Sequence, residues 1–275
     1  MKQILSDLTW ELETLDALVS GLDAAGWNKA TYCSDWTIKD VICHLAYFDS
    51  TARLAATDAE AFNNHMVEAF GKIKSMDEVA GISLGKGRAM TVPELLDWWR
   101  SQRAQKIKAL SPLDPKDRLP WYGPPMSARS FATARIMETW AHGQDVYDAL
   151  KIKRPASPGL KHIAHLGVTT FGWSFSNRQM DVPQAPVRVE LTAPNGDVWT
   201  WGEEDAKDRV RGPAEDFCLV VTQRRHVDDT VIKTQGDTAR QWMIYAQCFA
   251  GPPDKGPEKG FWKKGFEDSR GQGVE

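Results

Sequence analysis

Four long stretches of this chain carry apolar side chains at intervals of three and four residues, which is the spacing of one face of an α-helix. They cover about residues 2–24, 37–57, 91–110 and 127–149. The proline-rich run at 111–125 makes the third connection long and loop-like. Helices of this length, joined in this way, favour a four-helix bundle. The apolar stripe is clearest in the first stretch, which contains Leu5, Leu8, Leu12, Leu15, Leu18 and Leu22.

Short polar motifs predict where these helices begin. Thr37 and Asp40 have the three-residue spacing of a capping box, and so do the ends of Thr91-Val-Pro-Glu94. A further helix is expected at about 62–73. The segment Gly81-Ile-Ser-Leu-Gly-Lys-Gly-Arg88 follows it, and its three glycines predict a flexible loop. No strand precedes this segment, so its resemblance to a phosphate-binding loop is weak.

The pattern changes after about residue 155, where prolines interrupt it before one more expected helix at 159–178. Alternating apolar and polar residues at 187–192 and 198–201 then predict two strands, joined by a turn at Asn195-Gly196. The remaining expected elements are a helix that opens at Gly212, a strand within 229–235, and a helix at 238–249 capped by Asp237.

The sequence therefore predicts a mainly helical α+β protein with a domain boundary near residues 178–186. A helical bundle would occupy residues 1–180, and a small α+β domain would occupy residues 185–250. Residues 251–275 are rich in Gly, Pro, Lys and Glu, which is typical of a flexible tail.

Composition excludes several classes of function. The chain has 275 residues, 42% of them hydrophobic and 26% charged, which are ordinary values for a globular protein. A net charge of −3 gives no reason to expect nucleic acid or a membrane as partner. No apolar run of about 18 residues is present, and we do not expect the first residues to be a signal peptide, because they carry acids early and lack a continuous apolar core. The four scattered cysteines indicate reduced, buried thiols. We therefore expect a cytoplasmic monomer or homodimer that acts on a small molecule.

The segment Glu138-Thr-Trp-Ala-His142 places a carboxylate and an imidazole on one face of the fourth long helix, four residues apart. His44 lies on the apolar face of the second. If the two helices pack together, three protein ligands meet and a fourth position stays open, as in a catalytic zinc site. Cys43 points about 100° away from His44 on a helix and is not counted as a ligand. A Glu–His pair at this spacing is also common on solvated helix faces, so a bundle without metal remains an alternative.

Three motifs together resemble a known family. They are Trp36-Thr-Ile-Lys-Asp-Val-Ile-Cys-His44-Leu, then Glu138-x-x-x-His142-Gly-x-Asp145, and Gly212-Pro-Ala-Glu in the α+β module. They resemble the mycothiol-dependent maleylpyruvate isomerase-like proteins of the DinB-like metal-binding four-helix-bundle superfamily. The resemblance implies a divalent metal, most often Zn²⁺, held by His44, Glu138 and His142. It also implies a low-molecular-weight thiol such as mycothiol, and a carboxy-terminal module like a sterol carrier.

Metal coordination would deprotonate the thiol, and the thiolate would attack a small electrophile. The resemblance thus implies a thiol-dependent isomerase or S-transferase. Asp145 is a candidate catalytic residue that would orient a ligand, and Asp49 is a second candidate for that role. Arg225 is the candidate cation for an anionic substrate, with Arg224 and Arg88 as alternatives. The competing functions are a metal-dependent hydrolase, in which metal-bound water attacks, and a non-enzymatic module that binds a metal or a small ligand.

Overall fold

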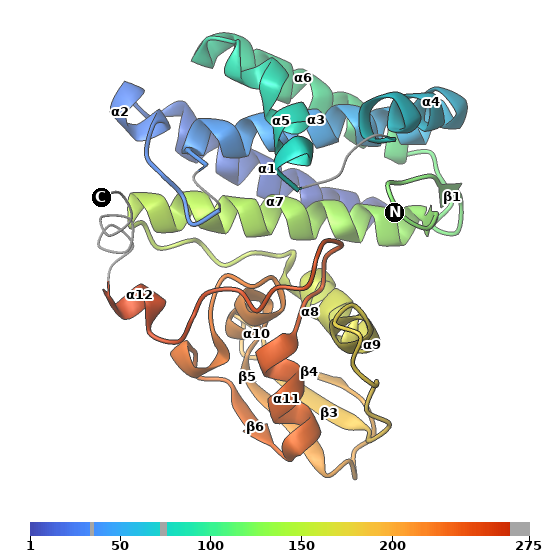
Figure 1. Cartoon of the computed structure of the whole chain (residues 1–275), viewed down its shortest axis with the longest axis vertical. Helices are drawn as coiled ribbons and strands as arrows, with labels where there is room; N and C mark the ends of the chain where they lie inside the picture. Colours follow the sequence, from blue (N-terminus) through green and yellow to red (C-terminus); the bar gives the residue numbers. More distant parts are fainter. Residues whose placement is uncertain (34–35, 72–75, 265–275) are drawn as a thin grey trace. The chain divides into compact units, whose positions relative to one another are not determined.

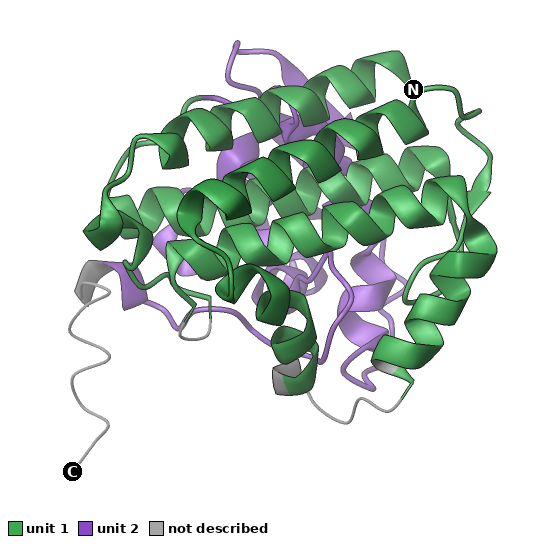
Figure 2. Ribbon diagram, turned by 90° about the horizontal axis from the view of Figure 1, so that it is seen from above, with its two compact units in different colours: residues 1–155 green, residues 156–275 purple. Residues whose placement is uncertain are grey.

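The computed structural model describes residues 1–33, 36–71 and 76–264. The chain divides into two compact units, residues 1–155 and residues 156–275 (Figure 2). This division lies earlier than the boundary that we predicted near residues 178–186. The reason is that the helices after residue 156 pack on later elements: Leu160–Thr169 (α8) contacts Ala214–Val221 (α10), and Phe171–Ser176 (α9) contacts Asp237–Tyr245 (α11).

The first unit contains the predicted bundle. Its four long helices are α1 (Lys2–Ser20), α3 (Ile38–Thr57), α6 (Val92–Leu110) and α7 (Ala128–Leu150), and all four sequence stretches are confirmed (Figure 1). Both α1 and α3 pack against α6 and α7. Leucines of the predicted stripe, among them Leu8, Leu12 and Leu15, are buried in the core. The shorter elements are α2 (Ala24–Trp27), α4 (Ala59–Phe70), α5 (Met76–Arg88), β1 (Arg118–Leu119) and β2 (Met126–Ser127).

Local capping fixes the first residues of the two helices that carry the predicted ligands. At the start of α3, Thr37 Oγ1 accepts a hydrogen bond of 3.2 Å from the Asp40 amide, and the Thr37 amide donates to the Asp40 carboxylate. At the start of α7, Ser127 Oγ accepts a hydrogen bond of 3.1 Å from the Ser130 amide. Each cap satisfies an amide that would otherwise lack a partner, so the helix registers are set locally.

The predicted loop at 81–88 is instead part of helix α5, and Gly87 explains the difference. A Cβ atom at this position would lie 2.4 Å from Cys43 Sγ and 2.8 Å from Cys43 Cβ. Glycine is therefore required because α5 approaches α3 closely, whereas a Cβ at Gly81 or Gly85 would meet nothing within 4 Å. The glycines indicated flexibility in the sequence, but one of them serves helix packing.

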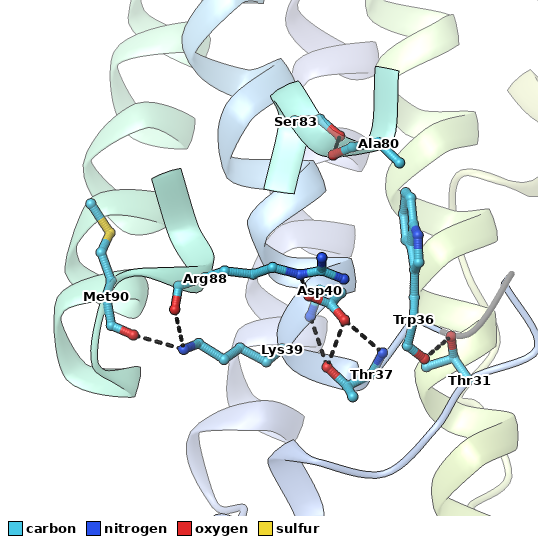
Figure 3. A network of polar contacts seen from close by, with 9 residues as sticks. All are labelled: Thr31, Trp36, Thr37, Lys39, Asp40, Ala80, Ser83, Arg88 and Met90. Atoms are coloured by element: carbon cyan, nitrogen blue, oxygen red, sulfur yellow. Dashed lines mark hydrogen bonds and ion pairs between the residues drawn. The ribbon is translucent and has the colours of Figure 1, made fainter. Parts of the chain in front are cut away.

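Polar contacts attach the end of α5 to the start of α3 (Figure 3). Arg88 Nε donates to Asp40 Oδ1 at 2.6 Å, and Lys39 Nζ donates to the carbonyl oxygens of Arg88 and Met90. Burial alone would raise the pKa of Asp40, but the hydrogen bonds from Arg88 and Thr37 hold it below its usual 3.8. Arg88, one of the predicted substrate cations, is thus engaged in a structural ion pair.

The second unit contains a four-stranded sheet in the order β4-β3-β5-β6. Strands β3 (Val187–Thr192) and β4 (Val198–Trp201) form the predicted antiparallel hairpin, with Gly196 at φ 91° in its turn. Strand β5 (Asp208–Pro213) pairs parallel with β3 and antiparallel with β6 (Lys233–Gln235). The sequence did not indicate β5, and Gly212, which we expected to open a helix, lies inside this strand. The helix expected at 159–178 is divided into α8 and α9.

The remaining elements of this unit are α10, a short 3-10 helix at Val227–Asp229, α11, and α12 (Phe261–Lys264). The expected flexible tail is attached to the unit as far as it is described. Trp262 Nε1 donates to the Arg224 carbonyl at 2.9 Å, and Asn177 Nδ2 donates to the Gly251 carbonyl at 3.1 Å. Residues 265–275 lie outside the described residues. Within the described chain, none of the helices has both the length and the apolar character needed to cross a bilayer.

Candidate metal centre

The packing of α3 against α7 brings the three predicted ligands together. Glu138 Oε2 lies 3.8 Å from His44 Nε2 and 3.5 Å from His142 Nε2. The centroids of the two imidazole rings are 4.6 Å apart. Glu138 and His142 come from the same face of α7, as their spacing predicted, and His44 faces them from α3. These three residues are called the triad below.

The spacing of the triad is compatible with a tetrahedral metal ion. Ligand bonds of about 2.0–2.1 Å at tetrahedral angles place neighbouring ligand atoms about 3.3 Å apart. The observed separations of 3.5 and 3.8 Å are close to this value, and both exceed the usual N–H···O distance. His44 meets Glu138 through Nε2, and its Nδ1 is enclosed without a hydrogen-bond partner among the described residues. The two nitrogens and one carboxylate oxygen are a donor set that suits zinc.

The electrostatics of the triad favour the protonation states that bind a metal. Burial, together with the neighbouring His142, lowers the pKa of His44 to about 4, against the opposite effect of Glu138. Burial would raise the pKa of Glu138, but hydrogen bonding to His142 and His44 outweighs it and holds this pKa well below 4.5. At neutral pH the site therefore presents a neutral His44 imidazole and an ionised carboxylate, and neither must lose a proton to coordinate.

Aromatic rings enclose the triad. Trp36 stacks over His142 with ring centroids 5.9 Å apart and an interplanar angle of 19°, and its ring lies 5.0 Å from that of His44. Phe48, one turn beyond His44 on α3, places its ring 4.7 Å from that imidazole. Thr31 holds the Trp36 backbone, because its amide and its hydroxyl both donate to the Trp36 carbonyl (Figure 3). These rings cover the two imidazoles in part, whereas the Glu138 side chain remains 25% exposed.

Asp145 lies behind His142. Its carboxylate is fully buried, and Oδ2 is 3.3 Å from His142 Nδ1. A carboxylate on the far nitrogen of a metal-binding imidazole fixes the ring orientation and raises its basicity. The location of Asp145 fits a positioning residue, because it lies at Nδ1 of His142, whereas Nε2 of that ring faces Glu138. The sequence did not indicate that Cys33 lies here: Cys33, His142 and Asp145 form a second group whose ligand atoms lie within 4.8 Å of one another.

The other predicted polar candidates have different partners. Asp49 Oδ1 accepts a hydrogen bond from Lys106 in a pair that is buried on both sides, so it does not face the triad as a free acid. Arg225 lies in the second unit, where its guanidinium is 3.9 Å from the Trp262 ring centroid and Nη1 donates to the Arg224 carbonyl at 2.8 Å. Its catalytic role stays a prediction.

The structure adds one residue that the sequence analysis missed. Arg135 precedes Glu138 by three residues and His142 by seven, so all three lie along one face of α7. It is only 6% exposed, and its guanidinium carbon lies 4.6 Å from the Trp121 ring centroid. Its position on the helical face of the ligands was the signal that could have identified it.

A four-helix bundle with a His–Glu–His group between two of its helices defines a DinB-like bundle. The family model described as the mycothiol maleylpyruvate isomerase N-terminal domain matches residues 8–147, and the chain belongs to this family. A second model, described as wyosine base formation, matches residues 183–234. This match lies in the module that we expected to resemble a sterol carrier, and that resemblance stays a prediction.

Proteins and structures similar to this chain agree with the family. Uncharacterized proteins from two strains of Mycobacterium tuberculosis are each 44% identical over 252 residues, which is 92% of this chain and 97% of theirs. The crystal structure of the mycothiol-dependent maleylpyruvate isomerase, and that of a histidine-to-alanine mutant of it, each align with a TM-score of 0.57. The alignments cover 85% of this chain and 92% of those chains at 14% identity, which shows a shared fold.

Proposed function

We propose that this protein is a thiol-dependent isomerase or S-transferase. It would use a divalent metal, expected to be Zn²⁺, held by His44, Glu138 and His142. The observation that carries the proposal is the position of Glu138 Oε2, 3.5 and 3.8 Å from the two imidazole nitrogens. The family match and the names of the similar structures support mycothiol as the thiol and a small electrophile such as maleylpyruvate as the substrate.

A divalent ion held by the triad would act as a Lewis acid that lowers the pKa of a bound thiol. The chain contributes the remaining elements of the mechanism. Asp145 holds the His142 ring in one orientation through the contact at Nδ1, so Nε2 faces Glu138. Trp36 and Phe48 exclude water from the imidazoles, which protects a reactive sulfur nucleophile. Three ligands from the protein leave a coordination position open for the thiol.

The hydrolase alternative lacks a suitably placed general base among the described carboxylates considered for this role. A base must reach the attacking water. Asp145 is fully buried behind His142, and Asp49 is paired with Lys106. Thiol dependence separates the functions: a hydrolase turns over without added thiol, whereas a binding module shows no turnover with or without it.

Elemental analysis of the purified protein tests the metal site. We expect about one divalent ion per chain, lost in His44→Ala and Glu138→Gln. His165→Ala is the matched control, because His165 is an exposed histidine in the second unit that accepts a hydrogen bond from Trp201. Cys33→Ser should also keep the metal. Loss in Cys33→Ser with retention in Glu138→Gln would assign the ion to the second group, and no metal after incubation with zinc would refute the proposal.

The reaction is tested separately on the metal-loaded protein. Maleylpyruvate should be consumed when mycothiol is present and remain stable when it is omitted. Loss of this turnover in Glu138→Gln, with normal turnover in His165→Ala, would connect the reaction to the triad. Equal turnover with and without thiol would instead favour the hydrolase.

A further inference from the structure

Arg135 is a buried cation that forms no ion pair with any described carboxylate. Among the described residues, no carboxylate or carbonyl accepts a hydrogen bond from its guanidinium, and Nε is enclosed with no acceptor. The group instead lies against aromatic faces, 4.6 Å from the Trp121 ring centroid and 6.0 Å from that of Phe131. Trp121 is itself stacked on Phe62, with an interplanar angle of 12° between the rings, so the surface under the guanidinium is held in place.

Burial of an unpaired guanidinium is costly, and the aromatic contacts offset only part of the cost. Moving a charged group out of water costs more free energy than a cation–π contact returns. Among the described carboxylates, Asp49 Oδ1 accepts a hydrogen bond from Lys106 while its Oδ2 is enclosed without a partner, and Glu138 faces the two histidines. Stability alone therefore does not explain a charged residue at this position.

The charge of Arg135 lies on the same face of α7 as two of the candidate ligands, three residues before Glu138 and seven before His142. Its place one turn before Glu138 aligns the guanidinium with the ligands along α7. A ligand that reaches the triad thus lies within the field of a cation whose donors are not already used by the protein.

We propose that Arg135 binds the anionic group of the small molecule that reacts at the triad, and that this group is a carboxylate. The inference rests on the proposed function, because it takes the triad as the reaction site. A planar guanidinium matches a carboxylate through two parallel hydrogen bonds, which lysine does not reproduce. Trp121 beneath the guanidinium fixes its plane, so Arg135 determines specificity by orienting the substrate as well as by attracting its charge.

The test measures binding of maleate and of its uncharged diamide by titration calorimetry, on zinc-loaded and chelator-treated protein. Arg135→Gln should weaken maleate binding about 10- to 100-fold, because a charge-assisted hydrogen bond is lost. It should leave the diamide affinity and the metal content unchanged. Arg129→Gln is the matched control, since Arg129 is an exposed arginine on the same helix. Arg135→Lys should show an intermediate loss, and it decides the question if the glutamine variant does not fold.

Two outcomes would overturn the proposal. The first is native-like maleate affinity in Arg135→Gln or Arg135→Lys, which would mean that Arg135 serves the fold. The second is the absence of saturable maleate binding to the native protein. Failure of the proposed function has a different signature, namely a metal content that does not depend on His44 and Glu138.

Discussion

Replacing Gly87 with alanine tests the close approach of α5 to the helix that carries His44. The added Cβ would lie 2.4 Å from Cys43 Sγ, 2.8 Å from its Cβ and 3.2 Å from its Cα, against about 3.5–4.0 Å for an ordinary contact. The obstacle includes backbone, so a change of rotamer does not relieve it. Overpacking of this kind lowers the free energy of unfolding by about 3 kcal/mol at most, and the higher helix propensity of alanine restores about 1 kcal/mol. The expected net destabilisation is about 2 kcal/mol.

Gly85→Ala is the matched control on the same helix. A Cβ there meets nothing within 4 Å, so this variant should be stabilised by about 1 kcal/mol of helix propensity. The helix-propensity contribution is common to both variants, and their difference of about 3 kcal/mol isolates the packing cost. In thermal melts with a chelator present, Gly87→Ala should melt about 4–8 °C below the native protein. Equal melting temperatures for the two variants would refute the close packing of α5 on α3.

Three other predictions concern charged side chains and their partners. Asp145→Asn should weaken zinc binding about 10- to 100-fold in a chelator competition, because the carboxylate orients His142; an unchanged affinity would contradict this. Lys106→Met alone, or Asp49→Asn alone, leaves one buried charge without its partner. Each should lower the free energy of unfolding, measured in urea, by about 3–5 kcal/mol, and the double variant should recover most of this loss. Burial alone would raise the pKa of Asp16, but the contacts with Arg100 and Arg103 outweigh it and lower the pKa below 3.8 in the folded protein. The ionised Asp16 therefore stabilises the fold above pH 3.8, and this contribution is lost as the pH falls through the lower pKa of the folded state. In Asp16→Asn the free energy of unfolding should therefore fall less steeply with decreasing pH below about pH 4, and the same pH dependence as in the native protein would contradict this.

The long helices could be predicted because their signals are local. A leucine stripe and a capping box depend on residues within a few turns, and the capping box at Thr37 and Asp40 forms as expected. The need for glycine at position 87 depends on its contact with Cys43 of another helix, which no local sequence pattern reveals. The same holds for β5 (Asp208–Pro213), because its parallel partner β3 comes earlier in the chain and its own residues do not alternate clearly. The division at residue 155 was missed because α8 has the periodicity of a bundle helix.

The candidate site shows the same division between local and distant information. Spacing alone placed Glu138 and His142 on one face of α7, but the approach of His44 required knowledge of how α3 packs. Cations were harder still, since an arginine has the same sequence signal on a surface as in a core. Arg88 is a candidate by its charge, yet it is paired with Asp40 in the structure. The sequence does not distinguish the buried Arg135 from arginines on the surface.

The character of α7 explains why these polar groups are better understood as functional than as structural. Most residues of this helix are buried, so apolar side chains would stabilise it best at nearly every position. Arg135, Glu138, His142 and Asp145 nevertheless follow one another along it, at a cost in desolvation that their contacts within the chain do not fully offset. A divalent ion would satisfy Glu138 and the histidines, and an anionic ligand would satisfy Arg135. The metal ion and the anionic ligand thus bind different side chains of the same helix, so metal content and maleate affinity can be tested independently.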